Sequence, residues 1–215
     1  MAKRPVPPTA TDEDVRVLLE RYRCPVPFHE VRTRFLGNIA SPIMGASPMK
    51  EVERLWGGEL PEFENIDAAN ELIGALVMGL WNRLAGHQER GNPFRLTRLD
   101  VPATREGLAI LALMRRQELD GFIDGLFGQE TAIDLPERAN RGLNVLGEMR
   151  ALMAAVLDMA NDETKTASSQ DVQATFRNLR DDEDCGTRDA RRILACTRAR
   201  RQLLATLPAS KPTLH

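Results

Sequence analysis

The stretch ATREGLAILALMRRQELDGFIDGLF, residues 103–127, decides the fold class of this chain. Its apolar residues recur at spacings of three and four, which place side chains on one face of a helix. They are Leu108, Ile110, Leu111, Leu113, Met114, Leu119, Phe122, Ile123 and Leu126. Gly128 follows the run and fits a C-terminal cap, because glycine readily adopts the backbone conformation that ends helices. The pattern therefore predicts one long helix over residues 103–127.

Similar patterns predict helices on the N-terminal side of this stretch. Their predicted starts are Thr11, Phe28, Ser47-Pro48, and either Asn65 or Asp67, and the second of them ends at Ala40. The threonine and serine are preferred N-cap residues, and proline suits the first helical position.

The fourth of these helices is apolar nearly all round from Leu72 to Trp81. A helix of this kind is typical of the centre of a core or of a surface beneath a partner subunit. Gly74 and Gly79 lower its helix propensity. We therefore expect another backbone to pass close to both glycines.

The C-terminal part continues the helical pattern. Asp134-Leu135-Pro136 begins a further helix, Ser168 and Ser169 cap a short one that ends near Arg180, and a last helix runs from Gly186-Thr187 to Leu207. Residues 94–101 alternate imperfectly and give a weak strand signal. The chain as a whole predicts an all-α multi-helix bundle of about seven to eight helices, with little or no strand.

The same signals predict a division of the chain into segments. These are a flexible arm (1–10), a helical core domain (11–160), a polar linker (161–168), a C-terminal helical hairpin packed on the core (169–207) and a tail (208–215).

Composition narrows the class of protein. Hydrophobic residues make up 42% of the chain and charged residues 28%, which is typical of a folded globular protein. Aromatic residues make up 5%, which favours helix over sheet. The net charge of −2 argues against a general polyanion binder.

The cysteines and the apolar runs make further functions unexpected. Cys24, Cys185 and Cys196 are widely spaced, so we expect neither a disulfide framework nor a structural zinc site. The longest apolar run, Leu72 to Trp81, is far shorter than the roughly 20 residues of a membrane span. The N-terminal sequence has no apolar core typical of a secretory signal. We expect a cytoplasmic protein with no membrane contact, no bound metal and no cofactor.

No motif predicts a catalytic residue. His29-Glu30 begins like a zinc-protease helix, but position 33 is threonine where that motif needs its second histidine. His87 lies near a predicted helix end, where a cationic residue suits the helix dipole.

A weak acidic cluster lies in the decisive stretch. It comprises Glu118, Asp120 and Asp124, and carboxylates at such spacings could bind a cation. Arg115 and Arg116 are close in sequence, so a solvated salt-bridge network is the favoured interpretation. The stretch GFIDGLFG, residues 121–128, lacks the preceding strand and the lysine of a phosphate loop.

Arginines concentrate in the predicted last helix. The candidates for partner binding are Arg188, Arg191, Arg192, Arg198 and Arg201, and they follow the acidic run at residues 181–184. One interpretation is an amphipathic helix docked on the core, with its arginines solvated or paired with the acidic run. The other is a contact surface for nucleic acid or an acidic partner. The first is favoured, because the net charge is negative and no aromatic residues lie among the arginines.

The order of several short signatures resembles the YecA/YgfB-like proteins, a bacterial family of helical proteins. The signatures are FLGNIASP (35–42), the Ser47-Pro48 start leading to LWGG (55–58), PEF (61–63), WNRLA (81–85) and ELDGFIDG (118–125). The resemblance covers residues 28–128 and implies an all-α bundle with a regulatory role. Longer members look to carry a C-terminal Cys/His zinc motif. Cys185 and Cys196 lack such partners here, so the resemblance transfers neither a metal nor a catalytic residue.

These observations predict a non-enzymatic interaction or regulatory protein that acts through helical surfaces. Its expected partner is an unidentified protein, and a homodimer fits the over-apolar fourth helix. One alternative is a nucleic-acid-linked regulator that uses the arginine-rich helix. A second alternative is an enzyme whose site is assembled from scattered residues such as Asp120, Asp124 and His87.

Overall fold

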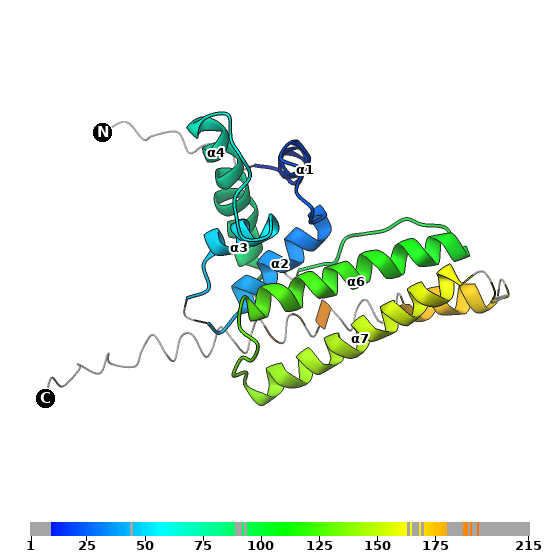
Figure 1. Ribbon diagram of the computed structural model, residues 1–215. Coiled ribbons are helices and arrows are strands. Elements are labelled where there is room, and N and C mark those ends of the chain that lie inside the picture. Colours follow the sequence, from blue (N-terminus) through cyan, green and yellow to red (C-terminus); the bar gives the residue numbers. More distant parts are fainter. Residues whose placement is uncertain are drawn as a thin grey trace, which may run out of the picture.

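The computed structural model describes residues 10–43, 45–88, 92, 94–162, 164, 168, 170–179, 187, 188, 190 and 193. Throughout these residues the regular structure is helical and no strand occurs, which confirms the predicted all-α multi-helix bundle (Figure 1). The elements are α1 (Asp12–Arg21), α2 (Phe28–Ala40), α3 (Pro48–Leu55), α4 (Ile66–Ile73), the π-helix η1 (Gly74–Trp81), α5 (Asn82–Ala85), the 3₁₀ turn η2 (Gly86–Gln88), α6 (Arg105–Phe127) and α7 (Glu137–Asn161). Residues 170–179 are helical as well.

The helix starts follow the caps expected from the sequence. Thr11 and Asp14 form a reciprocal capping box on α1. Asn65, rather than Asp67, caps α4, because its side chain accepts a hydrogen bond from the Ala68 amide at 2.9 Å. Pro48 opens α3 as predicted, although the Ser47 hydroxyl makes no cap bond. Local signals therefore place most helix starts to within two residues.

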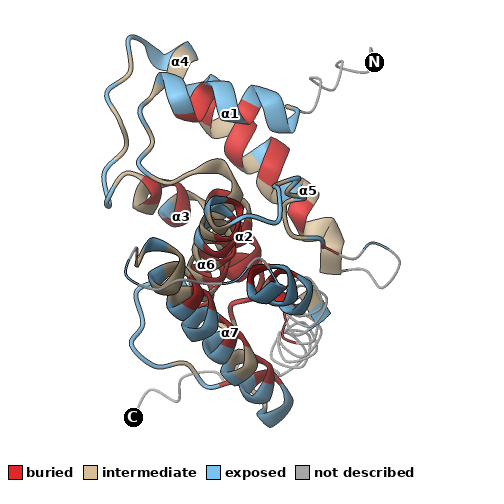
Figure 2. Cartoon of the chain, turned by 90° about the vertical axis from the view of Figure 1, so that its right-hand side faces the viewer, coloured by how far each residue is buried: buried red, intermediate tan, exposed pale blue. Residues whose placement is uncertain are grey.

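The long helix α6 organises the molecule. It contacts α2 and α7, and Figure 1 shows it lying between them, with α1, α3 and α4 gathered on the α2 side. Gly128 ends α6 with a positive φ of 61°, as its predicted cap role requires. Buried residues concentrate along α2 and on the inward sides of α6 and α7 (Figure 2).

Helices α2 and α6 meet backbone to backbone through glycines. A Cβ atom on Gly125 would lie 1.9 Å from the Arg34 carbonyl oxygen, and one on Gly37 would lie 2.1 Å from the Phe122 carbonyl oxygen. A Cβ atom on Gly121 would lie 2.7 Å from the Glu30 carbonyl oxygen. The glycines of residues 121–128 thus allow close packing of two helices.

The apolar fourth helix differs from its prediction. It is divided into α4, η1 and α5, and the Met78 side chain in η1 is 69% exposed. A place at the centre of the core is therefore wrong for the whole helix, because Met78 is exposed, whereas cover by a partner subunit stays a prediction. Gly79 has the expected close neighbour, since an added Cβ would lie 3.2 Å from the Ala10 Cβ. Gly74 does not, because nothing lies within 4 Å of such a Cβ.

Residues 94–101 form no strand. Phe94 is buried, and the Thr97 amide donates to the Glu118 carboxylate at 2.8 Å. A side chain of α6 therefore satisfies this backbone group without a neighbouring strand.

The C-terminal segment packs through apolar side chains where it is described. Ser168 caps the helix at residues 170–179, since its Oγ accepts from the Asp171 amide at 3.2 Å. Val172, Phe176, Leu179, Ala190 and Ile193 are buried.

The predicted arm at residues 1–10 lies outside the described residues up to residue 9, and the tail at 208–215 lies wholly outside them. The domain boundaries stay predictions.

A search of the described helices finds none that is long and apolar enough to cross a membrane.

Candidate functional site

The structure separates the three carboxylates of the acidic cluster. Glu118 is buried and pairs with Arg115 at 2.5 Å, whereas Asp120 pairs with Arg150 and Asp124 faces the Arg34 guanidinium at 3.8 Å. The favoured salt-bridge interpretation is therefore right in kind. The prediction of a solvated position is wrong for Glu118, because its side chain lies buried on the inward side of α6. The three residues do not form one site.

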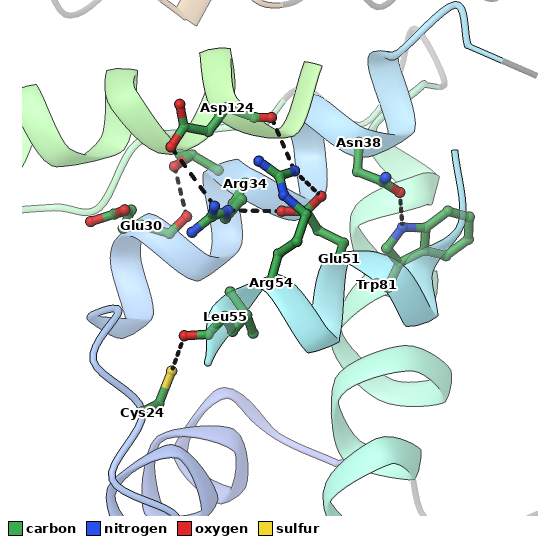
Figure 3. A network of polar contacts seen from close by, with 10 residues as sticks. Cys24, Glu30, Arg34, Asn38, Glu51, Arg54, Leu55, Trp81 and Asp124 are labelled. Atoms are coloured by element: carbon green, nitrogen blue, oxygen red, sulfur yellow. Dashed lines mark hydrogen bonds and ion pairs between the residues drawn. The ribbon is translucent and has the colours of Figure 1, made fainter. Parts of the chain in front are cut away.

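A buried charged junction joins α2, α3 and α6. Glu51 of α3 is 2% exposed and lies between two guanidiniums. Its Oε1 accepts from Arg34 Nε at 2.8 Å, and its Oε2 accepts from Arg54 Nη1 at 2.7 Å. Arg54 Nη1 also donates to the Asp124 carbonyl oxygen at 3.3 Å (Figure 3). We call Arg34, Glu51, Arg54 and Asp124 the charged junction.

The electrostatics of the charged junction are governed by burial. Burial raises the pKa of the Glu51 carboxyl, while Arg54 and Arg34 lower it in part. Burial also raises the pKa of the neighbouring Glu30 carboxyl. Arg34 lowers this pKa, and Asp124 raises it. Both Glu51 oxygens are engaged by guanidiniums, so this carboxylate is the counter-charge of Arg34 and Arg54 in the interior.

A small pocket adjoins the charged junction. It measures about 170 Å³, and its lining includes Ser41, Ser47, Lys50 and Arg54. Asn38 also lines it and accepts a hydrogen bond from Trp81 Nε1 at 3.1 Å (Figure 3). Cations and acids both line this pocket, since Glu51 and Glu130 belong to it too.

A second pocket has two arginines among its described lining residues. It measures about 320 Å³, and we call it the arginine pocket. The described residues that line it are Asp12, Arg32, Leu80, Arg83, Leu84, His87 and Asn92. They come from α1, α2, η1, α5, η2 and the segment after η2.

The two described histidines each have a hydrogen-bond partner. His29 lies at the start of α2 and shares a hydrogen bond of 2.9 Å with Gln117. His87 lies in η2, where its Nδ1 is 3.0 Å from the Asn92 carbonyl oxygen and its ring meets Phe94 edge-on. His87 lines the arginine pocket, whereas Asp120 and Asp124 pair with arginines on α7 and α2. The scattered residues of the enzyme alternative are thus not brought together.

An apolar stripe is exposed on α6. Ile110 and Leu113 are each 44% exposed, and Ala109 and Met114 beside them are partly exposed. Spacings of three and four residues put these side chains on one face of the helix. We call these four residues the α6 stripe.

The arginines of the predicted last helix are represented by Arg188. Its side chain is exposed, while Ala190 and Ile193 nearby are buried, as an amphipathic helix docked on the core requires. Arg191, Arg192, Arg198 and Arg201 lie outside the described residues. In the part of the chain that the structure describes, no group of three or more histidine, cysteine, aspartate or glutamate side chains could hold a metal ion.

These features define an all-α helical-bundle protein with a charged junction centred on buried Glu51, a pocket lined in part by two arginines, and an exposed apolar stripe. Comparisons with protein-family models, curated proteins and solved structures find no match for this chain. The resemblance to the YecA/YgfB-like proteins therefore stays a prediction.

Sequence reasoning missed the charged junction and the arginine pocket. Arg34 and Glu51 come from separate helices, and no periodicity links them. The spacing of Glu51 and Arg54 by three residues is a visible signal for a pair, but it is common on solvated helices and does not indicate burial. Arg32 and Arg83 are fifty-one positions apart, counted from their residue numbers, and tertiary packing alone brings them together.

Proposed function

We propose that this chain is a non-enzymatic interaction protein of the cytoplasm that binds a protein partner through the α6 stripe. The observation that carries the proposal is the exposure of Ile110 and Leu113, three residues apart on one helix. Single exposed apolar residues are common on protein surfaces, whereas a contiguous apolar face is typical of a contact site.

The surroundings of the α6 stripe support this role. Helices α2 and α7 occupy other sides of α6, so the helix that carries the stripe is held firmly. Arg105 at the start of α6 donates to the Ala160 carbonyl oxygen at 2.8 Å and to the Met159 carbonyl oxygen at 3.0 Å. A hollow of about 610 Å³, lined in part by Ala109, lies beside these contacts. A firmly held apolar face next to a hollow can bind a partner without rearrangement of α6, which lowers the entropic cost of binding.

Changing Ile110 and Leu113 together to aspartate is the direct test. We expect partner association to weaken at least tenfold, because burying two carboxylates at an apolar contact is costly. The free energy of unfolding should change by less than about 1 kcal/mol, since both side chains are surface positions. Partner recovery by the immobilised full chain measures the first quantity, and urea denaturation measures the second.

Val17→Asp is the matched control. Val17 on α1 is 47% exposed, which matches the exposure of the two α6 residues. Its replacement should leave partner recovery unchanged. If the double α6 variant recovers the same partners at wild-type levels, the α6 stripe is not the contact site. Sedimentation velocity of the wild-type chain tests whether the partner is a second copy.

The nucleic-acid-linked regulator is a second proposal, which rests on the arginines of the predicted last helix, of which the described Arg188 is exposed. It predicts recovery that nuclease abolishes and that weakens steeply with salt. Arg191, Arg198 and Arg201 changed to glutamate should remove that recovery, whereas the α6 variant should retain it.

A further inference from the structure

The described residues that line the arginine pocket carry an excess of positive charge. Arg32 and Arg83 contribute two cations, and Asp12 is the one carboxylate among these residues. That carboxylate is already engaged, since its Oδ1 lies 2.6 Å from Arg83 Nη2. Among the described lining residues, one positive charge therefore remains without a partner carboxylate, without counting His87.

Arg32 makes its hydrogen bonds to uncharged groups within the described residues. Its Nη1 donates to Thr97 Oγ1 at 3.1 Å and its Nη2 to the Arg95 carbonyl oxygen at 3.3 Å. Its guanidinium carbon lies 5.1 Å from the centre of the Phe94 ring. A guanidinium has five N–H groups, so these two bonds leave donors for a ligand.

Burial and the neighbouring arginines disfavour the charged form of Arg32. Burial lowers the pKa of its guanidinium; Asp12 and Glu118 raise the pKa, and Arg16 and Arg83 lower it again. An anion in the pocket would offset both the burial and the repulsion between like charges.

One other feature suits an anion. Leu80 and Leu84 line the pocket and are almost fully buried, and apolar walls strengthen electrostatic attraction. His87 Nδ1 donates to the Asn92 carbonyl oxygen, so the anion's donors come from the two guanidiniums.

We propose that the arginine pocket binds the phosphate group of a small molecule. Guanidinium groups present paired N–H donors that match the oxygens of carboxylates and phosphates, and a phosphate offers three or more oxygens to the two guanidiniums of this pocket. The pocket belongs to α1, α2 and the η1–η2 region, whereas the α6 stripe lies on another helix, so phosphate binding is independent of the proposed partner contact.

Isothermal titration calorimetry of the full chain tests the proposal, with inorganic phosphate and glycerol 3-phosphate as probes at constant ionic strength. We expect saturable binding that Arg83→Gln weakens about tenfold, which is the effect of one charge-assisted hydrogen bond. Tighter binding of the ester would identify a phosphorylated small molecule as the ligand, and equal binding would identify phosphate itself.

Asp12→Asn supplies a result that loss of folding cannot imitate. It removes the carboxylate that competes for Arg83, so binding should become severalfold tighter. Arg21→Gln is the matched control, because Arg21 pairs with Glu71 on the surface at 3.0 Å outside the pocket. The proposal is overturned if neither probe binds saturably, if Arg83→Gln and Arg21→Gln weaken binding equally, or if Asp12→Asn weakens it.

Discussion

Replacing Gly125 by alanine should destabilise the protein by about 3 kcal/mol, the upper end of the range for overpacked cores. The added Cβ would lie 1.9 Å from the Arg34 carbonyl oxygen and 2.9 Å from the Asn38 amide nitrogen. These are backbone atoms of α2, which no change of rotamer can move, so the two helices must separate. Urea denaturation measures the effect as a lower midpoint with an unchanged slope.

Gly147→Ala is the control for this substitution. Gly147 lies in α7, is exposed, and an added Cβ there meets nothing within 4 Å. Alanine should stabilise this position by about 0.5–1 kcal/mol, because glycine has the greater conformational freedom when unfolded. We therefore expect the free energy of unfolding to fall in Gly125→Ala and to rise in Gly147→Ala. A Gly125→Ala variant as stable as the wild type would contradict the backbone contact between α2 and α6.

The glycines show where sequence reasoning succeeds and where it ends. The residues around Gly121 and Gly125 predicted α6 correctly, because the apolar spacing of a long helix is strong even when glycines interrupt it. The role of those glycines depends on residues of α2 about ninety positions earlier, counted from their residue numbers, and no local pattern reveals this contact. Gly79 and Gly74 make the same point, since one has a close neighbour and the other has none.

The candidate sites were less predictable than the helices. Caps and periodicity act within a few residues, so the starts of α1, α3 and α4 follow from sequence. Whether a charged side chain is buried depends on which helices pack around it. The sequence predicts Glu118 in a solvated network, but this side chain is buried against Arg115. No sequence signal singles out Glu51, which lies at the centre of the charged junction.

Burial of Glu51 also makes its arginine partners important for stability. Arg34→Met keeps an unbranched side chain but removes Nε, which donates to Glu51 Oε1 at a distance of 2.8 Å. Removing one partner of a buried charge leaves it poorly compensated, so we expect a loss of about 3 kcal/mol at pH 7.5. Urea denaturation of both proteins at several pH values measures the loss.

The loss should depend on pH in a defined direction. Burial raises the pKa of folded Glu51 above its ordinary value of 4.5. A carboxyl with a raised pKa contributes its full stability below pH 4.5 and loses it as pH rises through the folded pKa. Because Arg34 lowers the pKa of Glu51, its removal raises that pKa further. The difference between wild type and variant should therefore be small near pH 4.5 and grow towards pH 7.5.

Two comparisons separate the buried charge from a general effect of losing an arginine. Arg21→Met removes an ion pair whose side chains are 52% and 54% exposed, and it should cost less than about 1 kcal/mol with little dependence on pH in this range. Adding Glu51→Gln to Arg34→Met removes a carboxylate that Arg54 alone would balance, and it should restore part of the lost stability at pH 7.5. If the double variant is as unstable as Arg34→Met at every pH, the loss comes from packing of the Arg34 side chain and not from the charge of Glu51.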